Sequence, residues 1–192
     1  MRELVYYVAV SLDGFIAGPE GQFDGFPVDG DHMQAIAETY PDTIPTDLAD
    51  SVGIERTTPM FDTVLMGWNT YAVGLPLGVR SPYRHLRQIV FSRTRRAEAD
   101  DVETRDDDPV AVVRALKREQ GRSLWLCGGG AMAATLSGEI DRLVLKRNPV
   151  LFGSGVPLFA PGRYAPERFD EVATTAFRSG VVISEYTRAA PH

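Results

Sequence analysis

The stretch Leu124-Trp125-Leu126-Cys127-Gly128-Gly129-Gly130-Ala131 decides how this chain folds. Its first half is a short apolar run, which is typical of a strand buried on both faces of a sheet. Three glycines follow at once and lead into the small residues of segment 131–136, which we predict to be a helix. A buried strand, a tight turn and a helix start therefore form one unit, and its glycines let the backbone pass close to a ligand.

The amides and the dipole at the start of this helix favour an anion, so the unit predicts a pyrophosphate site. It does not have the spacing G-x-G-x-x-G, because Ala131-Met132-Ala133 follows the third glycine. No acidic residue ends a next strand about 20 residues later, where an ordinary dinucleotide fold binds the ribose. These two departures argue against an ordinary Rossmann site.

The rest of the chain alternates apolar strands with amphipathic segments. Strands are predicted over 4–10, 63–66, 88–91, 124–127 and 143–146, helices over 31–40, 45–52 and 108–121, and a closing hairpin over 171–177 and 181–186. Asp31 and Asp108 are expected N-caps, and Leu48, Ser51 and Val52 are expected to share the apolar face of the second helix. The glycine- and proline-rich segment 18–30 is expected to be a long functional loop.

These elements predict an α/β protein with a mixed, mostly parallel sheet, helices on both faces and an antiparallel C-terminal hairpin. We expect one domain over residues 1–192, because a chain of this length buries an ordinary core without disulfides or a structural metal. The single cysteine, Cys127, and the absence of zinc-like Cys/His spacing favour a reducing, cytoplasmic setting. The apolar run 4–10 is too short for a signal peptide or a membrane span.

Charge excludes large polyanions as partners. The net charge is −6, and the only basic cluster is Arg93-Thr94-Arg95-Arg96, which is too small for a nucleic-acid surface. Such a cluster suits a single phosphate. The three histidines, His32, His85 and His192, have no serine or cysteine partner in a nucleophile-elbow context, so a catalytic triad is not expected.

The order of the motifs carries a resemblance. The chain presents Ala9-Val10-Ser11-Leu12-Asp13-Gly14-Phe15-Ile16-Ala17, then Val64-Leu65-Met66-Gly67 with Thr70-Tyr71, then Ile89-Val90-Phe91-Ser92-Arg93, then Leu126-Cys127-Gly128-Gly129-Gly130. Over residues 3–186 this resembles the dihydrofolate reductase-like superfamily, and within it the branch allied to the C-terminal reductase domain of bacterial riboflavin biosynthesis proteins. The segment Val150 to Phe159 also looks like the loop that precedes the last strands in that branch.

The resemblance implies an NADPH-dependent reductase of a small heterocycle, either pterin- or folate-like or similar to 5-amino-6-ribosylaminouracil. It would place the nicotinamide between Ala9 and Ile16, the cofactor phosphates at Gly67, Trp68, Asn69 and Thr70, the 2′-phosphate at Ser92, Arg93 and Thr94, and the pyrophosphate at Gly128, Gly129, Gly130 and Ala131. A guanidinium group suits a phosphate monoester, and backbone amides suit a pyrophosphate.

One position departs from the superfamily. The residue after the strand-ending Gly67 is commonly arginine there, whereas this chain has Trp68. The preference for NADPH over NADH then rests on Arg93, with Arg95 or Arg96 as neighbours.

Hydride reduction also needs a proton at the neighbouring heteroatom. Two acids are candidates for the catalytic role: Asp47, in a segment that resembles the acid-bearing helix of the folate enzymes, and Asp31. A bound water or a substrate group stays open as the donor, and either aspartate could be only an N-cap.

Two other readings remain. A nucleotide-binding module without catalysis is compatible with Trp68 and with the unassigned proton donor. A flavodoxin-like flavin binder would need a Ser/Thr-rich loop after the first strand, which Ser11-Leu12-Asp13-Gly14-Phe15 does not provide. We expect a homodimer, since the hairpin 171–186 offers Val172, Phe177, Val181 and Ile183 at an edge, and we expect neither a nucleic-acid nor a membrane partner.

Overall fold

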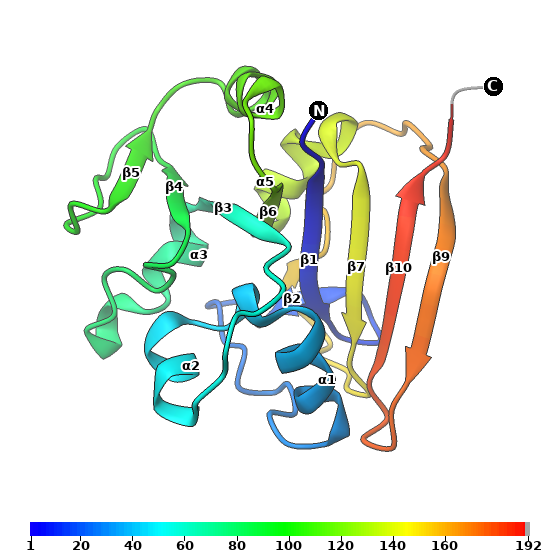
Figure 1. Cartoon of the computed structure of the whole chain (residues 1–192). Coiled ribbons are helices and arrows are strands. Elements are labelled where there is room, and N and C mark those ends of the chain that lie inside the picture. The colour runs from blue at the N-terminus through cyan, green and yellow to red at the C-terminus, as the bar shows by residue number, and fades with distance from the viewer. Residues whose placement is uncertain (191–192) are drawn as a thin grey trace.

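One eight-stranded sheet runs through the molecule (Figure 1). The computed structural model describes residues 1–190, so His192 lies outside the described residues. The strand order is β5-β4-β3-β6-β1-β7-β10-β9, and β2 and β8 form a separate two-stranded ribbon.

The elements have the following bounds. The strands are β1 (Leu4–Val10), β2 (Phe15–Ala17), β3 (Phe61–Gly67), β4 (Arg87–Phe91), β5 (Val102–Arg105), β6 (Ser123–Gly128), β7 (Arg142–Arg147), β8 (Val156–Pro157), β9 (Phe169–Ala176) and β10 (Val182–Arg188). The α-helices are α1 (Asp31–Thr39), α2 (Thr46–Val52), α3 (Trp68–Ala72), α4 (Pro109–Arg118) and α5 (Gly130–Thr135). Three short 3₁₀ turns are η1 (Pro41–Thr43), η2 (Leu75–Leu77) and η3 (Ser137–Glu139).

The sheet is parallel from β5 to β7, and β10 joins it antiparallel. The central strands β1 and β6 are almost fully buried, as continuous apolar runs of a parallel sheet should be. The carboxyl ends of β1, β3, β4, β6 and β7 therefore meet at one edge of the sheet, where ligands of open α/β sheets bind. The predicted mixed sheet with an antiparallel C-terminal hairpin is confirmed.

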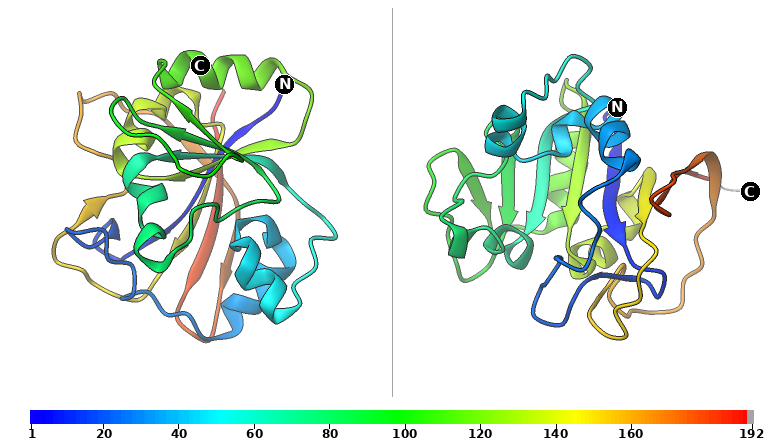
Figure 2. Two further views of the ribbon diagram at one scale, coloured as in Figure 1. Left: turned by 90° about the vertical axis from the view of Figure 1, so that its left-hand side faces the viewer. Right: turned by 90° about the horizontal axis from the view of Figure 1, so that it is seen from below.

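Helices cover both faces of the sheet (Figure 2). On one face, Ile36 of α1 and Ala49 of α2 are buried against Val64 and Trp125. On the other, Val113 of α4 and Ala133 of α5 pack among the side chains of β1, β3 and β6. Asp108 caps α4 as predicted, because its carboxylate accepts the Val110 N–H at 3.1 Å. Two hydrophobic layers therefore sandwich the parallel part of the sheet.

Two of the helix predictions are wrong in detail. Gly30 is the N-cap of α1, because the Asp31 carboxylate accepts the backbone N–H groups of Arg178 and Ser179 in the turn between β9 and β10. The predicted apolar face of α2 points to solvent: Leu48 is 52% and Val52 61% exposed, and Ala49 is the side chain that is buried.

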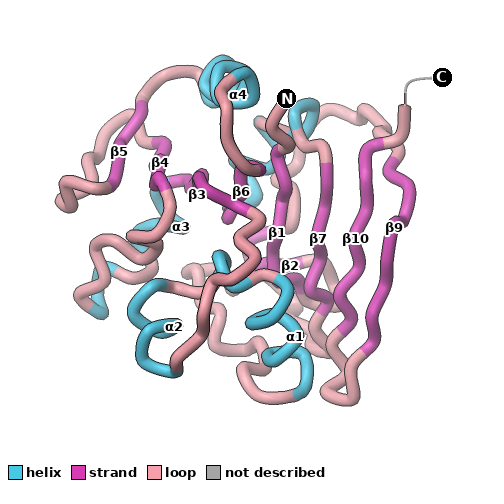
Figure 3. Tube along the Cα trace, in the orientation of Figure 1, coloured by secondary structure: helices cyan, strands magenta, loops and turns pink. Residues whose placement is uncertain are grey.

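The C-terminal edge also differs from its prediction. Of the four apolar side chains expected there, Val181 and Ile183 are buried in the core and Phe177 packs against it, because β10 lies inside the sheet. Only Val172, on the outer strand β9, is exposed. Residues 18–30 form neither helix nor strand, as predicted (Figure 3).

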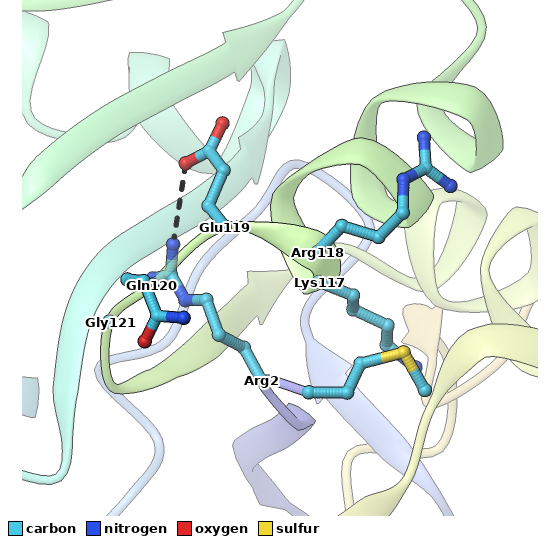
Figure 4. Close-up of a pocket in the computed structure, with 7 residues that line it drawn as sticks. Arg2, Lys117, Arg118, Glu119, Gln120 and Gly121 are labelled. Carbon is cyan, nitrogen blue, oxygen red and sulfur yellow. Dashed lines mark ion pairs between the residues drawn. The ribbon is translucent and has the colours of Figure 1, made fainter.

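A polar cluster lies at the end of the sheet where the parallel strands begin, opposite to their carboxyl ends (Figure 4). A cavity of about 300 Å³ is lined there by Met1, Arg2, Lys117, Arg118, Glu119, Gln120 and Gly121. The buried Arg2 guanidinium pairs with Asp62 and donates to Thr63 Oγ1 at 2.9 Å and to the Arg122 carbonyl at 2.6 Å. These groups join the amino ends of the strands. The N-terminus and the end of β10 lie on this same side of the molecule (Figure 1).

Candidate cofactor site

The glycine turn after β6 lies beside the end of β3. Met66 pairs with Gly128 across the two strands. A Cβ atom placed on Gly67 would lie 3.8 Å from the Gly128 carbonyl oxygen and 3.9 Å from the Gly129 nitrogen. Thr70, in the first turn of α3, faces the same spot, since a Cβ on Gly128 or Gly129 would lie 3.5 or 3.4 Å from its Oγ1 atom. The structure thus brings together the second and the fourth sequence motif.

The loop after β1 reaches the same glycines. A Cβ atom on Gly129 would lie 4.0 Å from Ile16 Cδ1, so Ile16 of β2 borders the turn. Asp13 holds this loop: its carboxylate accepts the Ser11 hydroxyl and the backbone N–H groups of Phe152 and Gly153. These hydrogen bonds, that of Ser11 first, lower the pKa of Asp13 below its usual value. The carboxylate therefore stays ionised at neutral pH and anchors the loop.

The third glycine has a packing role. Gly130 is buried, and a Cβ atom there would overlap the carbonyl oxygen of Pro157, while the Gly130 carbonyl accepts the Ala160 N–H at 2.9 Å. Gly130 is also the first residue of α5, which is only six residues long. A Cβ atom on Gly128 or Gly129 would instead meet only ordinary contacts, with Thr70 and Ile16, and Gly130 and Ala131 follow them into the helix.

The basic cluster follows the end of β4, next to the glycine turn. Phe91 pairs with Gly67, so Ser92 and Arg93 come directly after the neighbouring strand end. The three arginines of the cluster have different surroundings. Arg96 pairs with Asp106 at 3.0 Å, and the Arg95 guanidinium lies 5.5 Å from the centre of the Trp68 ring. Within residues 1–190 the exposed Arg93 side chain has neither an ion pair nor a hydrogen bond.

Trp68 lies between the basic cluster and the core. Its ring is half-buried and meets the edge of Tyr71 at a centroid distance of 5.4 Å. Its Nε1–H group is buried and has no acceptor among the described residues. Asn69, the next residue, is exposed. The arginine that the resemblance would place at position 68 is thus replaced by a ring on which Arg95 stacks, so positive charge still lies above this position.

The two candidate acids lie apart from the glycine turn. Asp47, at the start of α2, is on the surface and forms a bidentate ion pair with Arg84, which lowers its pKa. Asp31 is held by the backbone N–H groups of Arg178 and Ser179, and these bonds lower its pKa in turn. Both carboxyls are therefore ionised at neutral pH. A proton donor needs a pKa near the working pH, so the geometry does not favour either residue, and their catalytic role stays a prediction.

Sequence reasoning missed a lysine beside the first strand. Ala9, the residue expected at the nicotinamide, pairs with Lys146 of β7. Lys146 is half-buried and lies on the face of the sheet that carries α1 and α2, since Val144 two residues earlier is buried in that core. The signal in the sequence is a single charged residue that follows the apolar run 143–145.

Over residues 2–183 the chain matches the RibD C-terminal domain. The chain belongs to the RibD C-terminal domain family. The expected kinship with the riboflavin biosynthesis branch is thus confirmed, and the protein has the fold of a reductase domain.

Two curated relatives come from Bacillus subtilis (strain 168). The uncharacterized protein YwjB is 31% identical over 164 residues, which are 82% of this chain and 83% of that protein. The uncharacterized protein YyaP is 28% identical over 194 residues, covering 94% of this chain and 92% of that protein. These relatives support the family and name no substrate.

Two solved structures share the fold. A putative riboflavin biosynthesis protein from Shewanella sp. PV-4 superposes with a TM-score of 0.72 at 23% identity, over 99% of this chain and 100% of that chain. A diaminohydroxyphosphoribosylaminopyrimidine deaminase/5-amino-6-(5-phosphoribosylamino)uracil reductase from Thermotoga maritima superposes with a TM-score of 0.63 at 17% identity. The match covers 98% of this chain but 57% of the second protein. Among residues 1–190, no helix is long and apolar enough to cross a membrane.

Proposed function

We propose that this protein is an NADPH-dependent reductase that transfers hydride to a small heterocycle, either pterin- or folate-like or related to 5-amino-6-ribosylaminouracil. The observation that carries the proposal is the convergence of Gly67, Thr70 and Ile16 on the Gly128-Gly129 turn, at the carboxyl ends of parallel strands. Membership of the RibD C-terminal domain family supports a reductase.

The residues present fit a dinucleotide. Gly128 and Gly129 leave their backbone uncovered by side chains of their own, and a Cβ on either glycine would stand 3.5 or 3.4 Å from Thr70 Oγ1. In the proposed complex the backbone of this turn binds the pyrophosphate, while Ser92, Arg93 and Thr94 bind the 2′-phosphate of the adenosine. Ala9 and Ile16 flank the nicotinamide, and Asp13 holds the loop that carries Ile16.

NADPH supplies a hydride when it is bound. The chain's own residues fix the orientation of the nicotinamide and exclude water: Ile16 contributes an apolar side chain over the glycine turn, and the β2–β8 ribbon closes behind it. For the proton that accompanies the hydride, Asp47 and Asp31 stay predicted donors beside a bound water or a substrate group, and the lowered pKa values of the two aspartates favour the water or the substrate group.

A thermal-shift experiment tests the cofactor site. NADPH at a hundredfold excess over its dissociation constant should stabilise the protein by about 2.7 kcal/mol, which corresponds to a rise in Tm of roughly 5–11 °C for a domain of this size. Gly129→Val should reduce the shift, because its branched side chain fills the space beside Thr70, and the φ angle of −93° at this position lies outside the left-handed region that favours glycine. Gly138→Val is the matched control, because Gly138 is exposed and has nothing within 4 Å of its Cβ position.

Activity is tested by following cofactor oxidation with pterins, folates and ribosylaminouracil phosphates as substrates. A Tm shift without oxidation of NADPH by any of them would favour the second candidate, a nucleotide-binding module without catalysis. The surface ion pair of Asp47 and the hairpin contact of Asp31 are the observations that keep this alternative. No Tm shift with NADPH or NADH would refute both.

A further inference from the structure

Lys146 differs from the buried and half-buried cations around it in the sheet. The buried Arg2 pairs with Asp62, the buried Lys117 with Asp141 at 2.6 Å, and Arg142, on the same strand as Lys146, with Glu185 at 2.6 Å. Lys146 Nζ has no ion pair and no hydrogen bond within residues 1–190; it lies 4.4 Å from the centre of the Tyr7 ring. A half-buried ammonium without a carboxylate is therefore held over an aromatic face, beside the strand that carries Ala9.

The Tyr7 hydroxyl is a second group without a partner. Tyr7 is only 2% exposed, and its hydroxyl is buried with no hydrogen-bond partner among the described residues. Its ring neighbour Tyr40, 4.8 Å away, uses its own hydroxyl to donate to Glu185 at 2.5 Å. A buried polar group without a partner is costly, so such a group calls for an explanation. Two donors that lack acceptors in one place predict an acceptor from outside the chain.

Cys127, in the strand that leads into the glycine turn, packs on the same core as Tyr7. Burial raises the pKa of Cys127 to about 11, and the hydrogen bond with Tyr83 and the positive charge of Lys146 act in the opposite direction. Lys146, Tyr7 and Cys127 therefore lie on one face, between the carboxyl halves of β1, β6 and β7. This face adjoins the proposed position of the nicotinamide at Ala9.

We propose that Lys146 and the Tyr7 hydroxyl form the substrate subsite for an anionic oxygen, so that the reductase takes a planar heterocycle that is ionised at a ring oxygen. The proposal rests on the proposed function, because the ring must lie next to the nicotinamide. A compact ammonium prefers an anionic oxygen, and Lys146 is the partly exposed member of the pair, so a ligand oxygen would meet its Nζ atom first. Lys146 thereby acts as a specificity-determining residue.

Calorimetric titration with two pyrimidines of the same size tests this subsite. Barbiturate carries an enolate oxygen at neutral pH, whereas uracil is neutral, and each is titrated with and without saturating NADPH. The wild type should bind barbiturate at least about tenfold more tightly than uracil. Lys146→Met should lower barbiturate affinity about ten- to a hundredfold, which is the range for a lost hydrogen bond to a charged group, and should leave uracil and NADPH affinity unchanged.

Three further variants distinguish a role of Lys146 and Tyr7 in ligand binding from a purely structural role. Lys146→Arg keeps the charge and should retain most of the preference for barbiturate. Tyr7→Phe removes only the hydroxyl and should lower barbiturate affinity about two- to tenfold. Arg147→Met is the matched control, since Arg147 is exposed on the same strand, and it should bind as the wild type does.

The proposal is overturned if the wild type binds NADPH but not barbiturate, if Lys146→Met binds barbiturate as tightly as the wild type, or if it weakens uracil to the same degree. Failure of NADPH itself to bind would instead contradict the proposed function. The two failures are therefore distinguishable in one set of titrations.

Discussion

Arg93 is the residue on which the proposed preference for NADPH depends. Its neighbours Arg95 and Arg96 are engaged by Trp68 and Asp106, whereas the Arg93 side chain extends from the end of β4 without a partner among the described residues. An unpaired guanidinium beside a phosphate site can bind a monoester through two parallel hydrogen bonds.

Arg93→Ala should therefore lower NADPH affinity about ten- to a hundredfold, because it removes a charge-assisted contact worth roughly 1.5–3 kcal/mol. NADH affinity should barely change, since NADH has no 2′-phosphate. Calorimetric titration of both cofactors measures the effect, with Arg118→Ala as control because Arg118 is exposed near the opposite end of the sheet. An equal loss of both cofactors would show that the basic cluster has a structural role only.

Arg2, unlike Arg93, is buried, and its guanidinium group forms an ion pair and hydrogen bonds. Arg2→Ala removes its hydrogen bonds and leaves Asp62 without its guanidinium partner. We expect a loss of about 2–4 kcal/mol in the free energy of unfolding, seen as a Tm lower by about 4–16 °C. Arg118→Ala, on the same cavity wall (Figure 4), should change stability by less than about 0.5 kcal/mol. Equal stability of the two variants would contradict this account of the cavity.

At the scale of elements, His85 joins the start of α2 to η1. Its Nδ1 atom lies 2.8 Å from Thr46 Oγ1 and its Nε2 atom 3.0 Å from the Asp42 carbonyl. The neutral ring satisfies both contacts, accepting from the threonine and donating to the carbonyl. Burial is the main cause that lowers the pKa of His85.

This lowered pKa makes the anchoring of α2 pH-dependent. The folded state binds fewer protons than the unfolded state between the folded pKa and about 6.5, so stability falls as the pH drops through this window. Urea unfolding at several pH values should show this fall in the wild type and a smaller one in His85→Gln, which has no titrating ring. Identical slopes for the two proteins would mean that His85 does not carry the effect.

The elements that sequence alone predicted best are those whose signal is local. The strands β1 and β6 are continuous apolar runs, and α4 begins with an N-cap aspartate followed by proline. The edge strand β5 was not predicted, because only Val102 of its residues is buried and an exposed edge carries charges rather than an apolar pattern.

Errors arose where a distant contact decides the outcome. Asp31 has the residue type and position of an N-cap, but the hairpin 147 residues later in the chain binds its carboxylate. The buried side of α2 is set by the contact of Thr46 with His85, which lies 39 residues later in the chain. The pattern of seven helical residues does not contain this information. For the candidate site, the sequence predicted which motifs meet, because each motif follows the carboxyl end of a parallel strand. It could not predict that Arg93 and Lys146 lack ion pairs, because this depends on where acidic side chains from other segments lie.

At the scale of the molecule, the outer strand β9 determines how two copies could associate. It pairs only with β10, seven of its eight residues are exposed, and Val172 is 60% exposed. Such an edge offers unpaired N–H and C=O groups to a second strand. A homodimer therefore remains our prediction, now with β9 of two chains side by side.

Light scattering at micromolar concentration should report a particle of twice 21.1 kDa. Val172→Lys should shift it toward the monomer, because a charge would then face the second copy. Leu77→Lys, at a similarly exposed position in η2, should leave the dimer intact. A wild-type particle of one chain's mass would rule the dimer out.

Both ends of the described chain lie at the side of the sheet where Arg2 and Lys117 are clustered, away from the glycine turn (Figure 1). This placement makes the molecule tolerant of tethering. A linker at either end would leave the carboxyl ends of the parallel strands, where we propose the cofactor site, turned away from the attachment point. The protein could then be immobilised on a sensor surface, or joined to a reporter, through either end for the binding measurements proposed above.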